Sequence, residues 1–232
     1  MIALVDADIL VYRFGFASEG DPAEFALARL SEFLDNLILQ DGITEAWGYL
    51  TGSGNFRHDI AKTAPYKGNR VLEKPYHYQL LREYMEKSWG FEVVDGIEAD
   101  DAIGIEAYRH APEETIIVSI DKDLNMIRGN HYNFVKEEKY FVTEEDAIRN
   151  FYLQILTGDK VDNIIGLQGV GPVKSKKLLA DCNTELEMYE AVLKAYDGDE
   201  ARVLENARLL WILREEKQIW TPPVNSVLNV QK

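Results

Sequence analysis

Short apolar runs alternate with segments of helical periodicity over the first 143 residues of this chain. The runs that predict buried strands are residues 2–6, 45–52, 91–96 and 115–121. The segments that repeat apolar side chains at helical spacing are residues 23–40, 74–90 and 98–111. Strands that alternate with helices build a parallel sheet with helices on both faces. The sequence therefore predicts an α/β fold.

The later part of the chain has a different pattern. Residues 134–143 predict a small hairpin, and from residue 144 onward the pattern is almost entirely helical. We therefore expect an α/β body over 1–143 and a helical region over 144–232. The single cysteine, Cys182, excludes an internal disulfide, and we find neither a leader nor an apolar run of membrane-spanning length. These features predict a cytoplasmic protein with no membrane partner.

Acidic residues follow the predicted strands, where the carboxyl ends of parallel strands share one edge of the sheet. They are Asp6 after the first strand, Glu98, Asp100 and Asp101 after the third, and Asp121 and Asp123 after the fourth. Carboxylates crowded at one edge repel one another unless they are protonated or bound to cations. An all-oxygen ligand set suits Mg²⁺ or Mn²⁺, and two such ions support attack on a phosphodiester. The pattern predicts a site for two divalent metal ions.

A structural explanation exists for part of this acidic pattern. Asp and Glu in the first turn of a helix stabilise it by capping and by interacting with its dipole, so residues 98–101 could serve only as a cap. The formal net charge of −15 likewise predicts a largely acidic, solvated surface. The convergence of acids from separate strand ends favours metal binding for this set.

A glycine-rich stretch follows in the second half of the chain. Asp159 and Asp162 lie three positions apart, so a helical turn would point both side chains the same way. Gly166, Gly169 and Gly171 then precede a helix that carries Lys174. Glycines let backbone amides approach a phosphate, and a helix amino terminus adds partial positive charge. The stretch predicts a grip on a nucleic-acid backbone.

The motifs "EADDAIG" (98–104), "SIDKDL" (119–124) and "GDKVDNIIGLQGVG" (158–171) resemble those of the flap endonuclease/5′→3′ exonuclease superfamily, in the same order. "APYKGNRVLEKP" (64–75) and residues 206–223 resemble the compact 5′-exonucleases of T7-like phages. The resemblance implies a PIN-like nuclease body followed by a helix-three-turn-helix region at about residues 150–180 of this chain.

The resemblance also implies roles for individual residues. Asp6, Glu98 and Asp100 would hold a first metal ion, and a second would be held or oriented by Asp101, Asp121, Asp123, Asp159 and Asp162. Lys67 and Arg70, together with Asp100 and Asp121, would act in catalysis. The residues implied to contact DNA are Tyr66, which would stack on a base, Lys67, Arg70, Gly169, Gly171 and Lys174. A K⁺ ion would bind at the helix-three-turn-helix.

Two features depart from the family pattern. Thr51 and Gly52 stand where the family has an aspartate after the second strand, and we expect Asp8 to compensate. The short segment between Lys67 and Glu98 leaves no room for a closed helical arch, which favours trimming of duplex ends over strict flap cleavage.

We therefore predict a monomeric, metal-dependent 5′→3′ exonuclease of a phage, working in the host cytoplasm. It would act on duplex DNA with a free or flapped 5′ end and on RNA–DNA hybrids, including primer removal. Three alternatives stay open: a structure-selective flap endonuclease, a catalytically weakened module that binds branched DNA, and a haloacid-dehalogenase-type phosphatase suggested by "VDADIL" (5–10). The charge predicts modest, salt-sensitive DNA affinity that depends on local basic residues such as Arg57 and Lys62.

Overall fold

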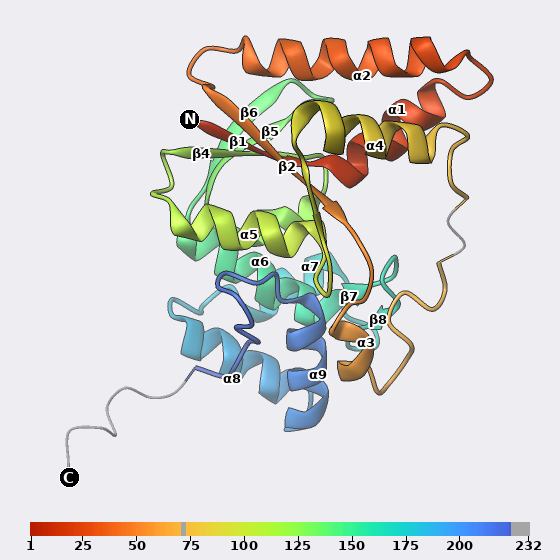
Figure 1. Ribbon diagram of the computed structural model, residues 1–232. Helices are drawn as coiled ribbons and strands as arrows, with labels where there is room; N and C mark the ends of the chain where they lie inside the picture. Colours follow the sequence, from red (N-terminus) through yellow and green to blue (C-terminus); the bar gives the residue numbers. More distant parts are fainter. Residues whose placement is uncertain (71–72, 224–232) are drawn as a thin grey trace. The chain divides into compact units, whose positions relative to one another are not determined.

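The computed structural model describes residues 1–70 and 73–223, and these form two compact units (Figure 1). The first unit consists of residues 1–55, 73–144 and 212–217, and the second consists of residues 56–70, 145–211 and 218–223. The chain therefore passes between the units more than once. Residues 71–72, inside the segment that resembles the phage exonucleases, and residues 224–232, at the end of the predicted helical region, lie outside the described residues.

A six-stranded sheet forms the centre of the first unit. Its strand order is β3-β2-β1-β4-β5-β6, with β1 Ile2–Asp6, β2 Glu45–Thr51, β3 Glu92–Val94, β4 Thr115–Val118, β5 Gly129–Asn133 and β6 Glu138–Val142. All neighbouring strands pair in parallel except β5 and β6. The predicted α/β fold with a mainly parallel sheet is confirmed.

Helices cover both faces of this sheet, as the alternating side chains of β1 show. Ala3 and Val5 pack in one buried cluster with α1 (Ala7–Ala17), α2 (Ala23–Ile38) and α4 (Tyr78–Trp89). Leu4 points to the opposite cluster, which contains α5 (Ala99–Arg109) and Ile212. A buried strand between two helical layers is apolar at every position, so β1 shows no alternation in its sequence.

The structure has one helix that the sequence did not predict and one hairpin that was misplaced. The sequence pattern did not indicate α1, because this helix begins directly after β1 and its apolar residues continue the apolar run of the strand. The hairpin was placed at 134–143, but its first strand is β5, which ends at Asn133. Pairing with β4 on one side and β6 on the other holds this polar strand, so tertiary contacts outweigh its weak propensity.

The second unit is mainly helical. Its elements are α3 Arg57–Ile60, α6 Glu144–Thr157 (whose first residue belongs to the first unit), β7 Gly158–Asp159, β8 Ile164–Ile165, α7 Pro172–Leu178, α8 Glu185–Ala195 and α9 Glu200–Leu210. Phe151 is fully buried and contacts the rings of Trp211 and Trp220 edge-on or tilted. These aromatic contacts pack the segments that carry Trp211 and Trp220 against α6.

The prediction of a helical turn carrying Asp159 and Asp162 is wrong. The two residues belong to a β-hairpin in which β7 pairs antiparallel with β8. Gly158 has a φ of 68°, and a Cβ added there would lie 2.3 Å from the amide nitrogen of Gly166. The backbones of residues 158 and 166 are therefore close enough that both positions need glycine, and Gly166 has a packing role in the hairpin.

Arg57 is a buried structural residue, although the sequence grouped it with the basic residues that would meet DNA. It is 3% exposed, and its guanidinium donates to the carbonyls of Leu209 (2.9 Å) and Trp211 (2.6 Å) at the end of α9. A cation at a helix carboxyl terminus satisfies carbonyls that lack intrahelical partners. Arg57 thereby fixes the start of the segment 56–70 to α9.

We expect Arg57→Met to destabilise the protein by about 2–4 kcal/mol, because two charged hydrogen bonds are lost and two carbonyls lose their partners. Urea unfolding followed by circular dichroism measures this effect, with Lys62→Met as a control because Lys62 is exposed in the same segment. Equal midpoints for the two variants would contradict the capping role.

No helix in the parts of the chain that the structure describes is long and apolar enough to span a membrane.

Candidate functional site

The acidic residues that follow β1 and β4 share one hydroxyl group in the first unit. Asp6 ends β1, is 3% exposed and accepts a hydrogen bond from the amide of Ile9, which caps α1. Ser119 Oγ donates to the other oxygen of Asp6 at 2.8 Å and accepts the amide of Asp121 at 3.0 Å. Ser119 thus ties the two strand ends together, a role that the sequence pattern did not indicate.

Asp121 and Asp123 begin a short 3₁₀-helix, Lys122–Met126, which starts after β4. The Asp121 carboxylate accepts the amide of Asp123 at 2.9 Å, so one of its oxygens caps this helix. Asp121 is therefore oriented from both sides, through its own amide and through its carboxylate.

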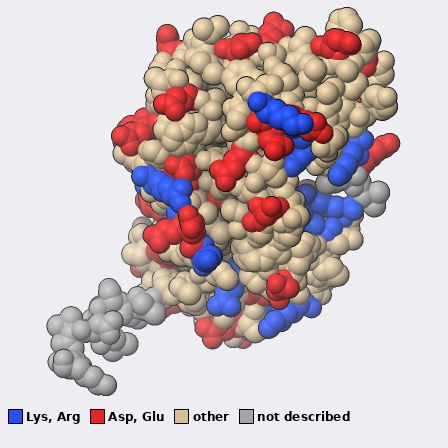
Figure 2. Space-filling model, viewed as in Figure 1, with Lys and Arg blue, Asp and Glu red and all other residues tan. Residues whose placement is uncertain are grey.

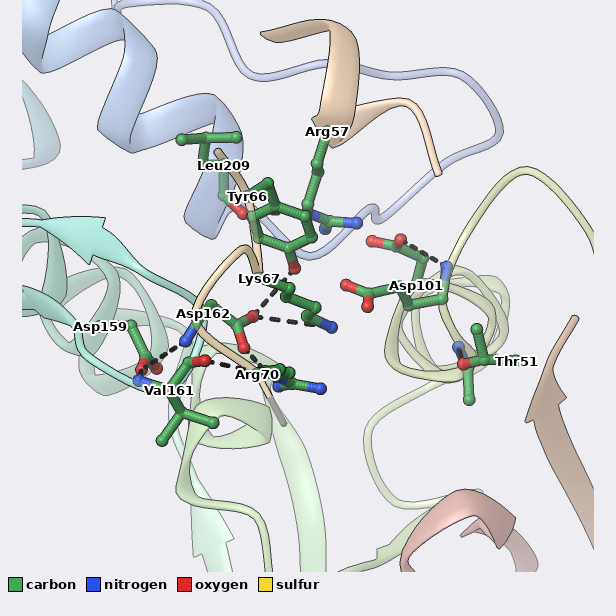
Figure 3. Close-up of polar contacts among 12 residues, drawn as sticks. Thr51, Arg57, Tyr66, Lys67, Arg70, Asp101, Asp159, Val161, Asp162 and Leu209 are labelled. Carbon is green, nitrogen blue, oxygen red and sulfur yellow. Dashed lines mark hydrogen bonds and ion pairs between the residues drawn. The ribbon is translucent and has the colours of Figure 1, made fainter. Parts of the chain in front are cut away.

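The acids at the start of α5 differ in burial, and Glu98 and Asp101 together form a capping box for this helix. Asp101 is fully buried, and its two oxygens accept the amides of Glu98 (3.1 Å) and Leu213 (3.0 Å). Figure 3 shows its carboxylate turned toward the start of α5. Asp101 therefore caps the helix and holds the segment 212–217, while Glu98 and Asp100 remain partly accessible.

Burial and mutual repulsion disfavour the ionised forms of Asp6 and Asp100. Burial, with the charges of Asp8 and Asp121, raises the pKa of Asp6 to about 7, against the opposing hydrogen bond from Ser119. Burial raises the pKa of Asp100 well above its usual value, and the charges of Asp6 and Asp121 add to this effect. The three carboxyl groups therefore act on one another electrostatically.

This oxygen-only set has the chemistry of a Mg²⁺ or Mn²⁺ site, because a bound cation would remove the repulsion that raises these pKa values. Over residues 1–70 and 73–223, however, no three His, Cys, Asp or Glu side chains already converge into an arrangement that could hold an ion. The donor types fit the ion, and the side chains would have to close around it.

The raised pKa values predict that added Mg²⁺ stabilises the protein more at pH 8 than at pH 5. A carboxyl group with a raised native pKa contributes its full stability below the unfolded-state value, and this contribution is lost as the pH rises toward about 7 for Asp6. Bound cations would restore it at high pH. Thermal unfolding in EDTA and in Mg²⁺ at both pH values measures the difference. The same shift at both pH values would contradict a carboxylate site.

A second polar cluster lies within the second unit, where four side chains meet around the turn between β7 and β8 (Figure 3). Asp162 accepts a hydrogen bond from the Tyr66 hydroxyl at 2.9 Å, pairs with Arg70 and lies 3.7 Å from the Lys67 ammonium. The Lys67 amide donates to the Asp162 carbonyl at 2.9 Å, which supports a left-handed φ of 54° at Lys67. Asp162 of the hairpin therefore holds Tyr66, Lys67 and Arg70, the residues predicted to contact DNA.

Burial separates the predicted roles of these residues. Tyr66 is 4% exposed, so its ring is buried and is not presented for stacking on a base. Asp159 is also buried, and its oxygens accept the amides of Val161 (2.6 Å) and Asp162 (3.3 Å) and the side-chain amide of Gln154 (3.2 Å). Asp159 therefore shapes the turn that presents Asp162.

The glycine-rich loop that follows this hairpin is open. A Cβ added at Gly169 or Gly171 would meet no heavy atom within 4 Å, and Gly169 has a φ of 75°. Gly171 precedes α7, and Lys174 is exposed in the first turn of that helix. The loop leaves its backbone accessible, as a phosphate contact requires.

A buried acid that the sequence did not single out supports the segment 56–70. Glu205 of α9 is 8% exposed and accepts the amides of Lys62 (2.7 Å) and Thr63 (2.6 Å) and the Thr63 hydroxyl (2.6 Å). Arg202 donates to the same carboxylate at 2.9 Å. Glu205 and Arg57 together fix the segment that carries Lys67 and Arg70.

Charge is mixed on the molecular surface shown in Figure 2, where acidic side chains lie between basic ones. This agrees with the formal charge of −15. The sequence placed the acids of the first unit and Asp159 and Asp162 of the second unit in one metal site. In the structure, the first set belongs to the first unit and the second set to the second unit.

Similarity in sequence extends over most of the chain, although no family profile matches it. The chain is 27% identical to the thermostable DNA polymerase I of Thermus aquaticus over 216 residues. This alignment covers 84% of the chain and 25% of the polymerase. The chain is 28% identical over 217 residues to the 5'-3' exonuclease of Buchnera aphidicola subsp. Schizaphis graminum, covering 83% of this chain and 74% of that protein. The chain thus spans about a quarter of the length of the polymerase.

The fold resembles that of the T5 D15 protein, whose crystals were grown with metal ions. The TM-score is 0.71 at 16% identity, and the alignment covers 90% of this chain and 88% of the other. The similarity extends through both units and establishes a common fold.

Proposed function

We propose that this chain, which is similar to a 5'-3' exonuclease and to DNA polymerase I, is a member of the flap endonuclease/5′→3′ exonuclease superfamily and a metal-dependent 5′→3′ exonuclease that hydrolyses phosphodiester bonds at the 5′ ends of duplex DNA. The observation that carries this proposal is the meeting of Asp6 and Asp121 at the carboxyl edge of the sheet, where Ser119 bonds to both residues and the charges of both acids act on Asp100. Repulsion among these carboxyl groups costs stability in the absence of a cation, and a site for divalent ions accounts for it.

The cofactor in this proposal is Mg²⁺ or Mn²⁺, held by the acids of the first unit. Bound in pairs, such ions supply charge neutralisation and an activated water for attack on a phosphodiester. Asp6 and Asp121 would keep their orientation through Ser119, and Asp101 would hold the start of α5. We also propose a K⁺ ion at the loop around Gly169 and Gly171, on the resemblance to the family and on the openness of that loop.

Lys67 and Arg70 are the groups that we propose to contact the substrate phosphate. Both cations pair with Asp162, so their charges are held in place beside a single acid. A phosphate group offers them charged oxygen acceptors, and Arg70 can donate two parallel hydrogen bonds to it. Exposed Lys174 and the amides of the glycine-rich loop would bind the duplex backbone without reading bases.

Duplex DNA with a free 5′ end is the substrate we propose, with flapped ends and RNA–DNA hybrids as further substrates of a monomeric enzyme. The sequence between Lys67 and Glu98 is short, and α4 takes up much of it. This short connection favours duplex ends over threading of a long single strand.

The test is digestion of blunt duplexes labelled at the 5′ or the 3′ end, beside a 5′-flap substrate and an RNA–DNA hybrid, in Mg²⁺, Mn²⁺ or EDTA. We expect metal-dependent release of short products from the 5′ label. Cleavage confined to the flap would favour a flap endonuclease. Binding to the flap without cleavage in either metal would replace the enzyme with a module that binds branched DNA.

A further inference from the structure

Thr51, the last residue of β2, uses all three of its polar groups to hold three helices together. Its amide donates to Asp8 in the first turn of α1 at 3.0 Å, and its carbonyl accepts from Arg82 of α4 at 2.7 Å. Its hydroxyl accepts the amide of Ala99, the first residue of α5, at 2.9 Å. Thr51 is therefore the point where the ends of these elements meet.

Arg82 closes this arrangement from the side of α4. Its guanidinium donates one hydrogen bond to Asp8 at 2.9 Å and another to the Thr51 carbonyl at 2.7 Å. The Arg82 side chain is 13% exposed and the Asp8 side chain 27%, so the pair is shielded from solvent screening more than a surface ion pair. The planar fork of arginine can reach both acceptors at once, which the single ammonium group of lysine cannot do in the same way.

In the structure, the two oxygens of Asp8 have protein partners in place of the metal-binding role that the sequence suggested for it. Asp8 was expected to replace a missing metal ligand after the second strand. One of its oxygens instead accepts from Arg82 and the other from the Thr51 amide. At Gly52, an added Cβ would lie 2.4 Å from an Asp95 oxygen and 2.8 Å from the Val94 carbonyl, so no side chain fits there. The end of β2 is therefore occupied by the hydrogen-bonded series Arg82–Asp8–Thr51–Ala99, which we call the relay.

We propose that Arg82 is a positioning residue for the carboxylate site, acting through Asp8 and Thr51 on the starts of α1 and α5. Asp8 lies two residues after Asp6, and Ala99 lies immediately before Asp100. The relay Arg82–Asp8–Thr51–Ala99 thus connects the backbone next to both acids, and it neutralises Asp8 beside them. This inference rests on the proposed function, since it assigns Arg82 to the same site.

A purely structural role for Arg82 would give a different result. If Arg82 only joined α4 to the sheet, its removal would lower stability without changing affinity for a cation in the remaining folded protein. A positioning role requires that metal affinity and kcat fall while KM for DNA stays unchanged, because no atom of the relay touches the substrate in this proposal.

The experiment measures Mn²⁺ binding by isothermal titration calorimetry without DNA, and kcat and KM on the 5′-labelled duplex. We expect Arg82→Met to weaken Mn²⁺ binding and lower kcat by about tenfold each, in the range found for groups that orient metal ligands. Arg82→Lys keeps the charge beside Asp8 and should recover stability more fully than kcat. Lys87→Met is the control, because Lys87 is exposed and pairs with Glu83 on the same helix.

A second pair of variants tests the relay where it meets α5, in case Arg82→Met unfolds. Thr51→Val removes the hydroxyl that accepts the Ala99 amide and should reproduce the loss of Mn²⁺ affinity, whereas Thr51→Ser should restore it. The effects of Arg82→Met and Thr51→Val should be non-additive, because both act through one set of contacts.

Unchanged Mn²⁺ affinity in both Arg82→Met and Thr51→Val, with normal kcat, would overturn the proposal and leave the nuclease function standing. Tighter Mn²⁺ binding in Arg82→Met would also overturn it, because Arg82 would then only withhold Asp8 from the ion. If the parent protein neither binds Mn²⁺ nor cleaves DNA, both the relay and the proposed function fail.

Discussion

Asp100→Asn is expected to abolish cleavage of a 5′-labelled duplex and, in EDTA at pH 8, to make the protein more stable than the parent. Burial and the charges of Asp6 and Asp121 raise the pKa of Asp100 well above its usual value, so the ionised form is unfavourable without a cation. Asparagine removes this charge and also removes an oxygen donor for metal. Loss of several kcal/mol of charge stabilisation corresponds to a decrease in rate of about a thousandfold.

Two measurements on the same preparation check this prediction: initial rates in Mg²⁺, and urea unfolding in EDTA. Asp41→Asn is the matched control, because it makes the same charge change at an exposed position and should alter neither quantity. Loss of activity together with loss of stability would indicate that Asp100 is needed for folding, and would remove the support for a metal-binding role. Retained activity would show that Asp100 is not part of the site.

Lys67→Ala is expected to lower kcat by about a hundredfold while the protein remains folded, because one preorganised cation is lost beside the proposed substrate phosphate. Lys67 lies 3.7 Å from Asp162, which keeps Arg70 as a partner, so the acid is not left unpaired. The alanine also replaces a residue with a left-handed φ of 54°, and the conformational cost is similar for both side chains.

The salt dependence of DNA binding separates a phosphate contact from a packing defect. Loss of one phosphate contact should reduce the slope of log affinity against log salt concentration by about one. Binding is measured by fluorescence anisotropy in Ca²⁺ with Lys194→Met as control, since Lys194 is exposed in the last turn of α8. An unchanged slope with normal kcat would remove Lys67 from the substrate site.

Local patterns in the sequence were sufficient to predict the strands that end in acidic residues. The apolar runs that end at Asp6 and near Asp121 predict buried parallel strands, and the rule that such strands share one edge predicts which acids meet. The order of the motifs indicated a resemblance to the flap endonuclease/5′→3′ exonuclease superfamily from the same residues, and the similarity to a 5'-3' exonuclease agrees with it. These inferences depend on residue type and spacing, which the printed sequence contains in full.

These patterns could not predict which charged side chains are buried or which groups they bond to. Nothing in the spacing distinguishes Asp101, whose oxygens hold Glu98 and Leu213, from Asp100 beside it. Arg57 has the same charge as Arg70, yet it is buried against the end of α9. Each of these outcomes depends on a segment more than a hundred residues away or on a helix end that only the folded chain brings near.

The sequence by itself determined the α/β class, the acidic edge and the glycine-rich loop, because these depend on periodicity and on local residue chemistry. The tertiary structure decided that Asp159 and Asp162 belong to a hairpin, that Ser119 joins two strand ends, and that Arg82 and Thr51 occupy the end of β2. The physical reason is that buried polar groups must find partners, and those partners are fixed by the packing of distant elements.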